Sequence, residues 1–166
     1  MQKIRFSDIT LREAARSGEG AFSFKEIIEL AKILDRLNLD VISLAPIENE
    51  KLDSLLVRTI AAAVKHSVLS VPVGFTEKGV ETAWKAAAEA AHPRLYVEAP
   101  LSAVQMEFVC QKKPEGIIDM IDSLVRKSRD CCAEVEFAAA DATRSEPEFM
   151  YRAIKRAIEA GATLIT

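Results

Sequence analysis

Residues 40–75 read DVISLAPIENEKLDSLLVRTIAAAVKHSVLSVPVGF, and this stretch decides the fold class. Two short apolar runs, residues 40–46 and 68–75, flank a segment with helical spacing from Lys51 to Val64. Mostly apolar runs of this kind are typical of strands that are buried on both faces of a parallel sheet. The stretch therefore predicts a strand–helix–strand unit with a right-handed crossover.

The same alternation continues along the chain in both directions. Two capping-box patterns, Ser23 to Glu26 and Ser145 to Glu148, mark helix starts, because the serine oxygen accepts a first-turn N–H and the glutamate reaches back. Gly161 is a suitable residue to end the last helix. Further strands are predicted at residues 4–10, 93–100 and 134–140, with a sixth beginning at residue 162, and further helices at residues 23–37, 78–91, 114–129 and 145–161.

Repeated strand–helix units predict an α/β fold with a parallel sheet, and two architectures compete. A (β/α)8 barrel needs about 250 residues, so the 166 residues would form only its first five or so units. A doubly wound five-stranded parallel sheet fits the same length without truncation. Residues 1–166 contain no linker or low-complexity tract, which predicts a single domain in either case.

The composition excludes several classes of protein. Lys and Arg number 22 against 25 Asp and Glu, and this mild acidity argues against a nucleic-acid binder. The longest apolar runs are too short for a membrane helix, and residues 1–5 do not resemble a signal peptide. An odd number of cysteines (Cys110, Cys131 and Cys132) implies no disulfide framework. A cytoplasmic protein without nucleic-acid or membrane partners is expected.

Polar residues follow the first predicted strand, at the end where both architectures place their functional face. Arg12 and Glu13 there could combine a fixed cation with a metal-binding carboxylate, or could form only a structural ion pair. A loop is predicted from residue 14 to residue 21. Its Gly18/Gly20 pair matches neither the dinucleotide-binding nor the P-loop motif, so it is a weak nucleotide signal.

Two later strands are followed by further candidates at the same end. Thr143 and Arg144 follow the fifth strand, in a loop that could either bind an anionic substrate or only cap the next helix. Gln105 lies in a long connection, residues 101–113, after the fourth strand. In contrast, His66 and His92 both come just before strands, at the opposite, stability-related face. We therefore expect neither histidine to act as a base or a metal ligand.

Three colinear segments resemble a known family. Residues 7–42 resemble its opening D-x-T-L-R-[DE] motif with the capped helix and D-V-I strand, residues 105–116 (QMEFVCQKKPEG) resemble H-M-E-Y-K-x-x-K-x-P-E-E, and residues 135–163 resemble the V-E-F-S-x-E-D-A-x-R stretch. The family is that of the 2-isopropylmalate and homocitrate synthases, which includes citramalate synthases and is related to 3-hydroxy-3-methylglutaryl-CoA (HMG-CoA) lyase. The resemblance covers nearly the whole chain.

The resemblance implies the amino-terminal portion of a (β/α)8 catalytic barrel that condenses acetyl-CoA with a 2-oxo acid at a divalent metal, Mg, Mn or Zn. It is an acyltransferase family of amino-acid biosynthesis. By this resemblance Glu13 is the metal ligand and Arg12 stabilises the oxyanion or enolate. Thr143, Arg144 and Gln105 are implied as substrate-binding residues. A hard metal beside a guanidinium suits chelation of a 2-oxo acid and charge that develops on oxygen.

Several positions depart from the family pattern. Gln105 replaces a histidine, and Ala138 and Ala140 replace a serine and a glutamate that is a candidate acid–base group. Residues 14–16 read Ala-Ala-Arg where Gly-Glu-Gln is usual. The resemblance also places a metal-binding His-x-His beyond Thr166, so we expect metal to bind weakly or not at all and the 166 residues alone to be inactive.

Two alternatives to the synthase remain open from the sequence. The first is lyase- or aldolase-like cleavage, because condensation and cleavage need the same stabilisation of charge on oxygen. The second is a catalytically inert half-barrel that pairs with another copy. Such a half-barrel would expose strand edges and apolar surface, which predicts a homo-oligomer, most simply a dimer.

Overall fold

The computed structural model of the chain describes residues 4–17 and 22–166, so the Gly18/Gly20 pair lies outside the described residues. The chain forms two compact units. The first contains Met1–Pro72 and Thr82–Arg94, and the second contains Val73–Glu81 and Leu95–Thr166. The single domain predicted for residues 1–166 stays a prediction.

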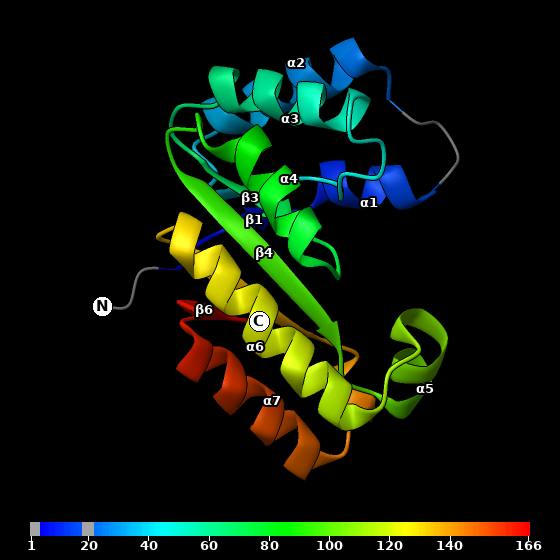
Figure 1. Ribbon diagram of the computed structural model, residues 1–166. Coiled ribbons are helices and arrows are strands. Elements are labelled where there is room, and N and C mark those ends of the chain that lie inside the picture. Colours follow the sequence, from blue (N-terminus) through cyan, green and yellow to red (C-terminus); the bar gives the residue numbers. More distant parts are fainter. Residues whose placement is uncertain (1–3, 18–21) are drawn as a thin grey trace. The chain divides into compact units, whose positions relative to one another are not determined.

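Parallel strands alternate with helices in the first unit. Its elements are β1 (Ser7–Asp8), α1 (Thr10–Ser17), α2 (Phe24–Arg36), β2 (Val41–Ser43), α3 (Leu52–Ala63) and β3 (Val68–Pro72). Ser7 of β1 lies opposite Val41 of β2, and Ser43 of β2 lies opposite Ser70 of β3. Helices α2 and α3 lie side by side in Figure 1.

The second unit repeats the pattern. The helix α4 (Glu77–Ala87) and the strand β4 (Pro93–Pro100) each have residues in both units. The remaining elements are α5 (Ala103–Gln105), the π-helical turn η1 (Met106–Cys110), α6 (Pro114–Cys131), β5 (Val135–Ala140), the 3-10 turn η2 (Ala142–Arg144), α7 (Pro147–Ala160) and β6 (Leu164–Ile165). β4 pairs with β5 and β5 with β6, again in parallel.

The strand order decides between the two predicted architectures. The strands follow the chain as β1-β2-β3-β4-β5-β6. Backbone hydrogen bonds join residues of β3 and its ends to residues of β4 and its ends. In the first unit the Leu69 N–H donates to His92 O at 2.9 Å, and in the second unit the Val73 N–H donates to Tyr96 O at 3.0 Å. A doubly wound sheet reverses its order at a switch point, and the described strands show no reversal. The prediction of a (β/α)8-barrel order is confirmed, and the doubly wound alternative is wrong.

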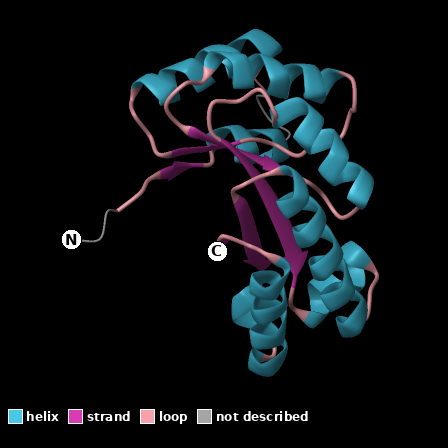
Figure 2. Cartoon of the chain, turned by 60° about the vertical axis from the view of Figure 1, so that its left-hand side comes forward, coloured by secondary structure: helices cyan, strands magenta, loops and turns pink. Residues whose placement is uncertain are grey.

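The core of the second unit lies between its strands and its helices. Alternate residues of β4 and β5, including Leu95, Val97 and Phe137, are fully buried on one face. Helices α6 and α7 supply Ile117, Ile121 and other apolar residues, and they pack along each other. In Figure 2 the helices of this unit gather on one side of its strands, so the two faces of the strands differ in environment.

The first strand and the segment after it differ from the prediction. The strand was expected over residues 4–10 and the loop from residue 14, but β1 is two residues long and a helix runs from Thr10 to Ser17. Asp8 explains the early helix start, because its carboxylate accepts the Thr10 N–H at 2.9 Å and the Thr10 hydroxyl at 3.1 Å. Leu, Arg, Glu and Ala then follow, which are all good helix formers.

One predicted capping box is confirmed and the other is wrong. At Ser23 both reciprocal bonds with Glu26 are present. At Ser145 they are not, because the turn η2 ends there and Pro147 occupies the first position of α7, which makes Glu146 the N-cap. Gly161 ends α7 with a φ of 112°, as expected for a glycine at this position.

Among the described residues, no helix combines the length and the apolarity that a membrane crossing requires. The long connection predicted over residues 101–113 contains α5 and η1. Ser102 begins this segment by accepting the Gln105 N–H at 3.2 Å, and Gln111 ends it with a φ of 49°.

Asp35 of α2 fixes the turn that precedes β3. Its carboxylate accepts the backbone N–H groups of Lys65 and His66 at 3.0 Å each and that of Ser67 at 2.8 Å. Asp35 is 5% exposed. Burial by itself would raise the pKa of Asp35, but the three backbone donors outweigh it and hold the pKa below its ordinary value.

Replacing Asp35 is expected to destabilise the first unit. Asp35→Ala removes the acceptor of three backbone donors and should lower the free energy of unfolding by about 3 kcal/mol, measured by urea denaturation. Glu89→Ala, at an exposed site, is the control and should stay within about 0.5 kcal/mol of the wild type. Equal stabilities of the two variants would contradict this role for Asp35.

The same residue predicts a pH dependence. The folded pKa of Asp35 is lowered, so its contribution is complete above the unfolded value and is lost as the pH falls through the folded value. The difference in stability between the wild type and Asp35→Ala should therefore shrink below about pH 4 and stay constant from pH 5 to 8. A difference that persists unchanged into acid would show that the ionised carboxylate is not responsible.

Candidate functional site

Arg12 and Glu13 lie in the first turn of α1, directly after the carboxyl end of β1. The bonds from Thr10 to Asp8 set the direction of this turn. The Arg12 Nε donates to the Glu13 Oε1 at 3.1 Å. The Arg12 side chain is 17% exposed and that of Glu13 is 44% exposed, so the guanidinium is the more desolvated partner. The pair thus presents a permanent positive charge and a reachable carboxylate at one strand end.

A mainly apolar pocket of about 580 Å³ lies in the same unit, next to the other face of α1. Leu11 and Ala14 line it from α1, and Leu44, Ala45 and Pro46 line it after β2. Neither Arg12 nor Glu13 is among its described lining residues. The pocket could take an apolar group, but it is separate from the charged pair.

A second polar cluster lies at the carboxyl ends of β4 and β5 in the second unit. Asp141, with a φ of 57°, accepts the Arg144 Nε at 2.8 and 2.9 Å and the Ser102 hydroxyl. The pKa of Asp141 is lowered by the bond from Arg144 and then by that from Ser102, and the same ion pair raises the pKa of Arg144. The Asp141 carboxylate therefore joins the two strand ends.

The predicted substrate-binding residues belong to this second cluster or flank it. Arg144 is exposed but ion-paired, Thr143 is exposed in η2, and Gln105 is half-buried at the end of α5. Their substrate contacts stay predictions. Ser102 and Asp141 were missed as site residues, although the Asp-x-x-Arg spacing from 141 to 144 could have indicated the ion pair.

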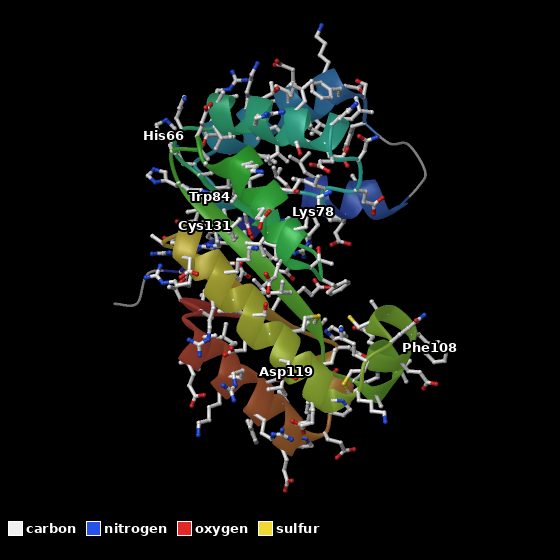
Figure 3. All side chains as sticks on the ribbon, viewed as in Figure 1. His66, Lys78, Trp84, Phe108, Asp119 and Cys131 are labelled. Atoms are coloured by element: carbon white, nitrogen blue, oxygen red, sulfur yellow. The ribbon has the colours of Figure 1, made fainter. Side chains whose placement is uncertain are left out.

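The donors for a catalytic metal are incomplete. No group of three His, Cys, Asp or Glu side chains within residues 4–17 and 22–166 could hold a metal ion. A catalytic metal normally has about three protein ligands. Glu13 is one suitable oxygen donor, so the described residues by themselves do not fit a complete metal site. Both histidines are exposed in the turns before β3 and β4, where they were expected, and Figure 3 shows His66 there.

Asp141 is expected to be essential to the order of the second cluster. Asp141→Ala removes its hydrogen bonds and places an alanine in the left-handed region, which should lower the Tm of the protein. Asp141→Asn tolerates that backbone conformation and keeps one acceptor, so its Tm should fall by less than about half as much. Thermal unfolding measures the stability of both variants. Equal losses in Asp141→Ala and Asp141→Asn would contradict the role of the left-handed backbone conformation beside that of the hydrogen bonds.

Comparison with known proteins gives a consistent result. The chain matches the family described as HMGL-like over residues 3–166. It is 34% identical over 164 residues to a 2-isopropylmalate synthase of Aquifex aeolicus, 32% over 166 residues to one of Lactococcus lactis subsp. cremoris, and 29% over 164 residues to one of Clostridium kluyveri.

Each of these matches covers 99% of this chain and 32% of the relative. The chain thus spans about a third of the length of the curated relatives it matches. The family that was expected from the three colinear segments is confirmed, because the match extends over nearly every residue. The chain belongs to the HMGL-like family.

Proposed function

We propose that this chain forms the amino-terminal strands of an acyl-CoA-dependent synthase that condenses acetyl-CoA with a 2-oxo acid, of the 2-isopropylmalate, homocitrate or citramalate type. The observation that carries the proposal is the Arg12–Glu13 pair in the first turn after β1, within a chain of the HMGL-like family. Relatives named 2-isopropylmalate synthase support the reaction class.

Arg12 suits the stabilisation of negative charge on oxygen. Condensation converts the thioester carbonyl into an enolate and the acceptor carbonyl into an alkoxide, and both develop charge on oxygen. A guanidinium stays protonated, and its partial burial strengthens its interaction with such an oxygen. Glu13 holds the guanidinium through Nε, at 3.1 Å from its Oε1.

Glu13 is also the carboxylate that we propose as a metal ligand. Its oxygen chemistry suits a hard divalent cation, and its side chain is accessible. Thr143, Arg144 and Gln105 are proposed to bind the acidic substrate, Arg144 after exchanging part of its contact with Asp141. The protein is proposed to work in the cytoplasm as a homodimer.

The reaction is tested with the protein expressed from the entire reading frame that encodes these residues. Release of free thiol from acetyl-CoA is measured with a panel of 2-oxo acids, with and without divalent metals, and HMG-CoA cleavage is assayed alongside. Thiol release that depends on one 2-oxo acid supports the synthase. Cleavage of HMG-CoA alone would favour the lyase alternative, and no thiol release with any acceptor would reject the synthase.

An inert scaffold is the second candidate, because no three-donor metal cluster lies among the described residues and Ala138 and Ala140 carry no catalytic group. Analytical ultracentrifugation distinguishes it in the same preparation. A self-associating protein without thiol release would fit the scaffold, whereas a well-behaved inactive monomer would count against both candidates.

Two substitutions test the charged pair. Arg12→Lys should reduce thiol release by about 100-fold or more, because a point charge replaces the planar donor fork at the developing oxyanion. Glu13→Gln should abolish the metal-dependent part of the activity. The control is Arg58→Lys, at an exposed site of α3, which should retain full activity. Metal-dependent activity that survives Glu13→Gln would disprove Glu13 as a ligand.

A further inference from the structure

The strand β4 carries a glutamate in an otherwise mostly apolar run. Leu95, Val97 and Ala99 are fully buried on one face, and Glu98 lies on the opposite face, where it is half-buried. A strand in a parallel sheet normally reads as a continuous apolar run, because both faces are covered. Burying a charged side chain in such a strand costs free energy unless the charge is paired or hydrogen-bonded. The presence of Glu98 in β4 therefore calls for an explanation.

The contacts of Glu98 are few. The Tyr96 hydroxyl, two residues earlier on the same face, donates to the Glu98 Oε2 at 2.9 Å. Within the part of the chain that the structure describes, no cation pairs with Glu98. Glu98 differs in this respect from carboxylates of the second unit that form ion pairs, such as Asp141 with Arg144. One hydroxyl positions the carboxylate and leaves its second oxygen available.

Small side chains lie beside Glu98 on the neighbouring strand. The register places Glu98 opposite Ala138, and Pro100 opposite Ala140. Neighbouring strands lie about 4.8 Å apart and side chains alternate between the two faces of a sheet, so Glu98 shares one face with positions 138 and 140. These are the two positions where the family pattern has a serine and a glutamate. In this chain β5 has alanines at these two positions, and the neighbouring strand β4 carries a carboxylate, Glu98, on the same face.

The segment after β4 supports a site at this place. The π-helical turn η1 ends at Cys110, and π-helical turns are frequent at functional sites. Burial raises the pKa of the Cys110 thiol, Lys112 lowers it, and the charge of Glu98 raises it, so the Cys110 thiol interacts electrostatically with Glu98.

We propose that Glu98 is the general base of this chain, on β4 rather than β5, with Tyr96 as its positioning residue. The inference rests on the proposed synthase function. Glu98 removes a proton from the acetyl methyl group: the C–H bond breaks, an O–H bond forms on Glu98, and the electron pair moves into the enolate. The enolate carbon then bonds to the 2-oxo carbon, whose carbonyl oxygen becomes an alkoxide and takes the proton back from Glu98. Water then hydrolyses the thioester of this adduct: its oxygen bonds to the acyl carbon, the C–S bond breaks, and the free thiol that the assay measures is released.

The test uses the protein from the entire reading frame and three variants. Glu98→Gln keeps the shape and an acceptor for Tyr96 but cannot take a proton, so kcat should fall by about 100-fold or more with KM nearly unchanged. Glu98→Ala should be equally slow and should regain activity with added formate, which supplies a carboxylate in the vacated space. The control is Glu148→Gln, an exposed carboxylate in the first turn of α7, and it should stay within about threefold of the wild type.

The outcomes separate this inference from the proposed function. A wild type that releases no thiol with any 2-oxo acid overturns the proposed function, and the role of Glu98 falls with it. A wild type that is active, with Glu98→Gln within threefold of it, overturns only the role of Glu98. Slow Glu98 variants that formate does not restore also overturn it, because a structural loss would explain them. Should Glu98→Gln fail to fold, as seen by thermal unfolding, the formate response of Glu98→Ala decides.

Discussion

Parallel strand pairing is the constraint on which the other features of this chain depend. Each parallel neighbour requires a crossover of a dozen or more residues, and a right-handed crossover returns the chain to the same end of the next strand. Residues that follow a strand therefore collect at one end of it. This explains why Arg12 and Glu13 follow β1, and why Ser102 and Asp141, 39 residues apart in sequence, can share a hydrogen bond after β4 and β5.

The sequence was most informative where apolar periodicity and burial agree. The strand β4 runs over Pro93–Pro100 as predicted, and α6 begins at Pro114 as predicted, because the buried residues that made these patterns visible also form the core. The hydrogen bonds of Asp35 could not be predicted from a pattern of apolar residues. Its three bonds join α2 to residues 65–67, and only the folded chain brings those donors together.

Local hydrogen bonds account for the errors. The carboxylate of Asp8 begins α1 earlier than the predicted loop allows. At Ser145 a capping-box pattern was misleading, because the preceding turn and Pro147 shift the helix start by one residue. In the candidate site, Arg12 and Glu13 were found through a motif, whereas Asp141 and Glu98 needed their partners to be known.

The charged side chains at the strand ends differ in whether an ion pair holds them. Arg12 is held by Glu13, and Arg144 is held by Asp141, so in each pair the cation bonds to a carboxylate one to three residues away in sequence. Such local pairs form without help from the rest of the fold. Glu98 is different, because the sheet brings it beside Ala138 and, among the residues that the structure describes, only the Tyr96 hydroxyl bonds to its carboxylate. This combination of partial burial, one tyrosine bond and no paired cation among the described residues is what the proposed proton transfer by Glu98 rests on.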